Sequence, residues 1–123
     1  MTKILLVEDD ALNREMVTRR LVLAGYQIIS ATDGATAVAL AETELPDLIL
    51  MDLGLPILNG WQATQRIKAT PYTQHIPIIA LTAYALTEDH DKSIAAGCDD
   101  YEPKPINFAQ LQAKIEALLE RPG

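Results

Sequence analysis

The sequence predicts an α/β fold of five strand-then-helix units, (βα)5, in one domain covering residues 1–123. Short apolar runs alternate along the chain with longer segments of helical periodicity. Most runs are continuously apolar, which is typical of parallel strands buried on both faces. The 123 residues, 49% of them hydrophobic, are enough for one domain with a sizeable core. Strands that alternate with helices indicate a parallel sheet with helices on both faces.

Five segments are expected to form the strands. Apolar runs mark four of them: residues 3–7, residues 27–31 (the weakest of the four), residues 48–51 and residues 76–81. The fifth candidate, residues 99–102, is mostly polar and is followed by Pro103. Proline has no backbone N–H to donate to a neighbouring strand, so this strand is expected at an edge of the sheet.

The first two helices are expected at residues 11–24 and from about residue 33. Asp10 and Asp33 are interpreted as their N-caps, and Gly25 as the stop of the first helix. The first helix has apolar positions at Leu12, Met16, Leu23, Val17, Leu21 and Ala24. The second is expected to turn three side chains inward: Val38, Ala41 and Leu45.

Three more helices complete the pattern. The third begins after Asn59, with Gln62 three residues later in a variant of the capping box, and Trp61 is expected to pack at its start. The fourth, residues 86–96, is mostly polar and ends at Gly97. The fifth, residues 107–120, places four core side chains at helical spacing: Phe108, Leu111, Ile115 and Leu118.

Charge and composition narrow the range of functions. The formal charge of -7 argues against direct binding to nucleic acid or to an anionic membrane. Cys98 is the single cysteine, so an internal disulfide is impossible, and we interpret it as a small, semi-buried residue without chemistry. Neither a signal peptide nor an apolar stretch of membrane-spanning length is present, so a cytoplasmic protein is expected. Met1 lies just before the first strand, which favours a free-standing protein.

Polar residues gather where the predicted strands end. They are Glu8, Asp9 and Asp10 after the first strand, Asp52 after the third, Thr82 after the fourth and Lys104 after the fifth. In open α/β sheets the carboxyl ends of the strands form the binding crevice. His75 and His90 lie away from these positions and are interpreted as surface residues.

Converging carboxylates repel one another unless a cation joins them. Oxygen ligands without nearby His or Cys favour a hard ion, so Mg²⁺ is the expected cofactor. A carboxylate can act as a nucleophile toward phosphorus, and Asp52 would take that role. The Thr82 hydroxyl and the Lys104 ammonium could both bind the oxygens of a phosphoryl group.

Four motifs in this order resemble those of the response-regulator receiver family, the CheY-like proteins. They are Val7-Glu8-Asp9-Asp10, Met51-Asp52-Leu53-Gly54-Leu55-Pro56, Leu81-Thr82-Ala83 and Lys104-Pro105. Each motif alone is weak, but four at these intervals are highly specific, and the resemblance covers residues 3–119. It implies a flavodoxin-like fold with strand order 2-1-3-4-5, in which the first and third strands are neighbours.

The resemblance also implies a metal site. By it, Asp9 would bind Mg²⁺ directly, Glu8 would bind through water, and Asp52 and the backbone carbonyl of Gly54 would complete the protein ligands. Asp9 would then be a metal ligand rather than simply a helix cap.

For the phosphoryl group, the resemblance implies that Asp52 accepts it while Thr82 and Lys104 hold it, with Ala83 leaving space. The Lys104–Pro105 bond would be cis. Tyr101 would be the aromatic residue that turns inward when Thr82 moves toward the phosphoryl group.

The implied function is a switch in a two-component phosphorelay. A sensor histidine kinase or a histidine phosphotransfer protein would supply the phosphoryl group. A downstream protein would read the surface formed by the fourth helix, the fifth strand and the fifth helix. We expect a monomer or weak dimer, no direct nucleic-acid or membrane contact, and no enzymatic activity beyond slow self-dephosphorylation. Two residues bear on the lifetime of the phosphorylated state: Gly54 offers no polar side chain near the attacking water, and Tyr84 could shield that water.

Three alternative functions share parts of this sequence pattern. A magnesium-dependent phosphatase with an aspartyl nucleophile needs a second acid two residues later, where this chain has Gly54. A flavin- or nucleotide-binding module would need a glycine-rich phosphate loop after the first strand, and the sequence has none there. The remaining alternative is a receiver-like interaction domain that is not phosphorylated.

Overall fold

The computed structural model describes residues 1–55, 58–82 and 97–120. Within these residues, five parallel strands form one sheet in the order β2-β1-β3-β4-β5. The strands are β1 (Lys3–Val7), β2 (Gln27–Ala31), β3 (Leu48–Asp52), β4 (Ile78–Thr82) and β5 (Asp100–Pro103). The predicted fold class and strand order are confirmed, and β5 lies at a sheet edge as expected.

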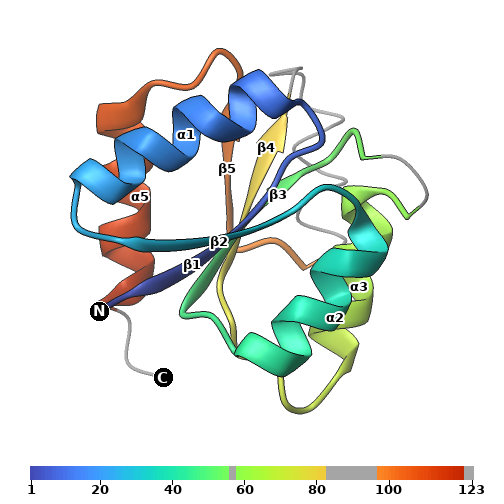
Figure 1. Cartoon of the computed structure of the whole chain (residues 1–123). Coiled ribbons are helices and arrows are strands. Elements are labelled where there is room, and N and C mark those ends of the chain that lie inside the picture. The colour runs from blue at the N-terminus through green and yellow to red at the C-terminus, as the bar shows by residue number, and fades with distance from the viewer. Residues whose placement is uncertain (56–57, 83–96, 121–123) are drawn as a thin grey trace.

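Helices cover both faces of the sheet (Figure 1). α1 (Ala11–Leu23) and α5 (Phe108–Leu119) lie on one face, and α2 (Gly34–Glu44) and α3 (Gly60–Ala69) lie on the other. The predicted fourth helix, residues 86–96, lies outside the described residues.

The strands divide the core by alternation, because successive side chains of a strand point to opposite faces. One cluster joins α2 and α3 to Leu5, Val7, Ile49, Met51, Ile78 and Ala80. The other joins α1 and α5 to Ile4, Leu6, Leu48, Leu50, Ile79 and Leu81. β1, β3 and β4 are buried on both faces, which explains why their sequences are continuously apolar.

The helix starts follow the predicted caps. The carboxylates of Asp10 and Asp33 accept from the backbone N–H groups of Asn13 and Thr36, so both are N-caps. Asn59 forms a reciprocal capping box with Gln62 at the start of α3. At the end of α1, Gly25 has φ +101°, a left-handed conformation that favours glycine.

One predicted inward position was wrong, and the apolar positions of α1 divide between two faces of the helix. On α1, Val17 and Leu21 are buried, whereas Leu12, Met16 and Leu23 are exposed. These three lie on a stripe of the helix turned away from the sheet, and a helix in this layered fold buries only one stripe. Leu45 was expected to point inward from α2, but it is the left-handed C-cap of that helix and is exposed.

No helix among the described residues is long and apolar enough to span a bilayer.

Candidate phosphoacceptor and metal site

The predicted site residues meet at the carboxyl edge of the sheet. Asp52 is the last residue of β3 and Thr82 the last of β4, while Glu8 and Lys104 directly follow β1 and β5. Parallel register brings these strand ends together, with Asp52 beside Leu81 and Thr82 beside Pro103. The juxtaposition therefore follows from topology, and not from closeness in sequence.

Lys104 is the centre of the polar contacts at this edge. Its Nζ lies 3.1 Å from Glu8 Oε1 and 3.4 Å from Asp52 Oδ2. Both carboxylates are buried, with Glu8 only 2% exposed and Asp52 7% exposed. A buried carboxylate is costly unless it is paired, so one ammonium shared by two acids leaves the site short of positive charge.

The pKa values of these groups reflect that shortage. Burial, and then the neighbouring Asp52 carboxylate, raise the pKa of Glu8 to about 7, although Lys104 acts in the opposite direction. Burial alone would lower the pKa of Lys104, but the charges of Asp52 and Glu8 outweigh it and raise that pKa. The site therefore favours cations strongly.

Three carboxylates converge closely enough to share one ion. One oxygen from each of Glu8, Asp9 and Asp52 lies within 4.8 Å of the others, with Asp9 exposed at the mouth. The second Asp52 oxygen, Oδ1, accepts from the backbone N–H of Gly54 at 3.0 Å. An all-oxygen set that is open to water on one side suits Mg²⁺, which retains several water ligands. These residues therefore fit the predicted ion.

The two predicted switch residues lie on neighbouring strands, Thr82 on β4 and Tyr101 on β5. Thr82 is buried, and its carbonyl oxygen accepts from the backbone N–H of Lys104 at 2.7 Å. Tyr101 is partly buried and packs against the core cluster on the α2 and α3 face. The Lys104–Pro105 peptide bond is cis, as the resemblance implies. Ala83 and Tyr84 lie outside the described residues, as does His90.

The remaining singled-out residues lie apart from the site chemistry. His75 is exposed, and Trp61 packs at the start of α3 against the adjoining core. Cys98 is buried, and that burial raises the pKa of its thiol to about 11. A buried, protonated thiol is unreactive, which agrees with its interpretation as a core residue.

Sequence reasoning missed two features that support the site. Arg14 donates to the carbonyl oxygen of Glu8 at 3.0 Å, fixing the loop after β1. Glu102 is buried and paired with Lys114 of α5 at 2.9 Å. A charged residue inside a strand was a usable signal for the second feature, because an acid in a sheet that packs helices on both faces needs a partner.

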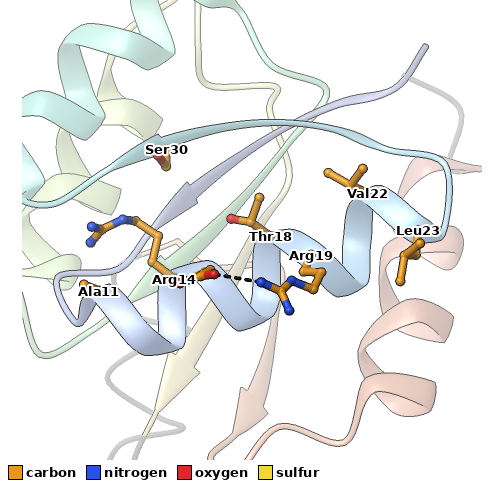
Figure 2. A pocket seen from close by; sticks show the side chains of 8 residues that line it. Ala11, Arg14, Thr18, Arg19, Val22, Leu23 and Ser30 are labelled. Atoms are coloured by element: carbon orange, nitrogen blue, oxygen red, sulfur yellow. Dashed lines mark hydrogen bonds and ion pairs between the residues drawn. The ribbon is translucent and has the colours of Figure 1, made fainter.

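Two hollows that border α1 differ in their relation to the site. One, of about 550 Å³, adjoins the site and is lined by Glu8, Lys104 and a largely apolar wall that includes Met16, Val17, Ile106 and Phe108. The other, of about 590 Å³, lies between α1 and β2; Figure 2 shows Arg14, Thr18 and Val22 along the helix, with Ser30 on the strand. The second contains none of the residues that meet at the carboxyl edge.

Comparison with known proteins agrees with this geometry. A family model described as the response regulator receiver domain matches residues 4–116. The chain belongs to the response regulator receiver family. Receiver domains of this type are signalling switches rather than conventional enzymes.

Relatives of this receiver domain differ in length. It is 37% identical over 121 residues to RpaA of Synechocystis, a DNA-binding dual master transcriptional regulator, covering 98% of this chain and 50% of RpaA. The chain thus spans about half the length of that relative. It is also 37% identical over 120 residues to the polar-differentiation response regulator DivK of Brucella ovis, covering 97% of this chain and 98% of DivK.

A solved receiver domain is similar throughout. The receiver domain of the sensor histidine kinase PA1611 from Pseudomonas aeruginosa superposes with a TM-score of 0.92 at 40% identity, covering 98% of each chain. That structure has a magnesium ion coordinated in its active-site cleft.

Proposed function

We propose that this receiver domain is a phosphoacceptor switch that takes a phosphoryl group on Asp52. The observation that carries the proposal is the placement of Lys104 Nζ, 3.4 Å from Asp52 Oδ2 and 3.1 Å from Glu8 Oε1. The Asp52 carboxylate can act as the nucleophile. The Lys104 ammonium beside it can stabilise the negative charge that develops on the phosphoryl oxygens.

In the proposed step, an Asp52 oxygen attacks phosphorus and forms a new P–O bond. The bond from phosphorus to the donor breaks, and its electron pair leaves with the donor group. The ammonium of Lys104 and the hydroxyl of Thr82 would hold the phosphoryl oxygens. The Gly54 N–H, 3.0 Å from Asp52 Oδ1, keeps that carboxylate oriented.

Bound Mg²⁺ would neutralise charge between the carboxylates and the incoming phosphoryl oxygens. The residues that would hold it are Asp9 and Asp52 directly, Glu8 through water, and the carbonyl oxygen of Gly54. Their support is the shared 4.8 Å cluster of the three carboxylates and the oxygen-only donor set.

The biological donor would be a sensor histidine kinase or a histidine phosphotransfer protein in the cytoplasm. The added charge of about -1.5 to -2 would draw Thr82 and Lys104 toward it and let Tyr101 turn inward. A downstream protein would read the change on the surface formed by residues 86–96, β5 and α5, without direct contact to nucleic acid.

The test uses acetyl phosphate as donor, with and without Mg²⁺, and intact mass as the readout. The wild type should gain one phosphoryl group, about 80 Da, only when Mg²⁺ is present. Asp52→Asn should gain none. Asp10→Asn is the matched control, because it makes the same chemical change nearby while asparagine still caps α1. A mass gain in Asp52→Asn equal to that of the wild type would refute Asp52 as the acceptor.

A further inference from the structure

Lys114 of α5 makes three contacts with two consecutive residues of β5. Its Nζ donates to Glu102 Oε1 at 2.9 Å and to the carbonyl oxygen of Tyr101 at 2.6 Å. The same ammonium lies 5.3 Å from the centroid of the Tyr101 ring, within the range of a cation–π contact.

These contacts reach both faces of the sheet. Glu102 is in register with Leu81, whose side chain belongs to the core beneath α1 and α5. The Tyr101 ring packs instead against the core beneath α2 and α3. Because β5 is the edge strand, the long side chain of Lys114 can pass around it and hold neighbours that point in opposite directions.

The Lys114 contacts with Glu102 and Tyr101 also hold the segment that carries Lys104. Glu102 is 1% exposed, and its second oxygen, Oε2, accepts from the backbone N–H of Asn107 at 3.4 Å. Asn107 is the N-cap of α5. Lys104 lies between these two fixed points, and its own N–H bonds to β4. One ammonium thus links α5 to the backbone and ring of Tyr101 and to the buried Glu102.

We propose that Lys114 is a positioning residue for the switch, holding the Tyr101 ring in its present arrangement, in which Lys104 pairs directly with Asp52. This rests on the proposed function, in which Tyr101 moves after phosphorylation. In this arrangement one Asp52 oxygen accepts from the Gly54 N–H and the other lies beside Lys104, so a phosphoryl group on Asp52 would disturb both contacts. Any state in which the ring leaves Lys114 loses the cation–π contact, so Lys114 biases the equilibrium away from that state.

A merely structural role makes a different prediction. If Lys114 only neutralises the buried Glu102, its loss lowers stability and leaves affinity for the phosphoryl group unchanged. If it also holds the ring, its loss raises that affinity by about two- to five-fold, the equivalent of one exposed cation–π contact.

The experiment measures Mg²⁺-dependent binding of beryllium trifluoride, a mimic of the phosphoryl group, by titration calorimetry on the full chain. Glu102→Gln is the reference, because it removes the buried charge and keeps the ammonium over the ring. Glu102→Gln with Lys114→Met removes the ammonium without leaving a carboxylate unpaired. Glu102→Gln with Lys114→Arg restores a cation. The same variants are repeated with Tyr101→Leu.

The Lys114→Met double variant should bind beryllium trifluoride about two- to five-fold more tightly than Glu102→Gln. On the Glu102→Gln background, Lys114→Arg should restore the weaker binding of beryllium trifluoride. With Tyr101→Leu added, the affinities of the Lys114→Met variant and its reference should become equal. Equal affinities with the ring present, or a difference that persists without the ring, would overturn the inference while leaving the phosphoacceptor function intact. Failure of the wild type to bind the mimic would overturn the proposed function and this inference with it.

Discussion

Replacing Gly60 with alanine should damage both the fold and the site, because this glycine packs directly on the backbone of the proposed acceptor. Gly60 is the first residue of α3 and is buried. A Cβ atom there would lie 2.4 Å from the carbonyl oxygen of Asp52 and 2.7 Å from the Cα of Leu53. Both neighbours are backbone atoms, which cannot rotate away as the end of a side chain can.

The distances set the size of the effect. Ordinary contacts of a Cβ begin near 3.4 Å, so α3 and the end of β3 would have to separate by about 1 Å. Overpacking of this kind typically costs about 1–3 kcal/mol. Alanine is favoured over glycine within a helix by at most about 1 kcal/mol, which offsets only part of that. We expect Gly60→Ala to lower the free energy of unfolding by about 2 kcal/mol.

The assay is urea unfolding followed by circular dichroism, together with Mg²⁺ titration of the folded protein. Gly54→Ala is the matched control: its Cβ would meet only Asp52 Oδ1, at an ordinary 3.7 Å. Both changes reduce the flexibility of the unfolded chain equally, so that contribution cancels in their comparison and the clash, less the helical preference of alanine, remains. Mg²⁺ affinity should fall in Gly60→Ala, because Asp52 is displaced. Equal unfolding free energies for the two variants would refute the reasoning.

Three further predictions concern pH, a buried hydroxyl and the buried thiol. The pKa of Glu8 rises from 4.5 to about 7 on folding, so the metal-free protein should lose stability as pH increases across that window, by at most about 3 kcal/mol. Urea unfolding at a series of pH values should show this decrease in the free energy of unfolding, and Glu8→Gln should reduce it. Thr73 is fully buried, and its Oγ1 donates to the carbonyl oxygen of Ile67 at 2.7 Å. Thr73→Val should therefore lower the free energy of unfolding by about 1–3 kcal/mol and lower the melting temperature, and an unchanged melting temperature would contradict this. Cys98 should resist alkylation at pH 8 in the folded protein and react readily in urea, because burial raises the pKa of its thiol to about 11; equal rates in both conditions would argue against its burial.

The layered fold could be predicted because local patterns and global topology agree. Continuous apolar runs specify strands covered on both faces, and Asp10, Asp33 and Asn59 mark helix starts through side-chain chemistry that needs no distant partner. The side of α1 that faces the sheet could not be predicted as well. Leu12 and Val17 are both apolar, but Val17 lies on the buried side of α1 and Leu12 on the exposed side.

The candidate site could be assembled from the sequence because its residues follow strand ends, which parallel topology brings together. The contacts that hold these site residues in place could not be predicted from the sequence in the same way. The Gly60 contact with Asp52 depends on the close approach of two backbones, and the Lys114 contact with Glu102 depends on how α5 passes the sheet edge. Neither distance is encoded by spacing along the chain.

The charge balance of the site gives one reason to expect a divalent ion. Glu8, Asp9 and Asp52 bring three carboxylates to one edge, and Lys104 supplies the ammonium that contacts two of them. When all are ionised, this set carries a formal excess of two negative charges, which a divalent cation balances and a monovalent one does not. In the proposed reaction, transfer of a phosphoryl group would add oxygens and charge at the same place, so the cation and Lys104 would be needed more after the reaction than before it. If the cation and Lys104 bind phosphorylated Asp52 more tightly than the free Asp52 carboxylate, phosphorylation favours the conformation in which these contacts are made. This difference in binding free energy is what can drive a switch.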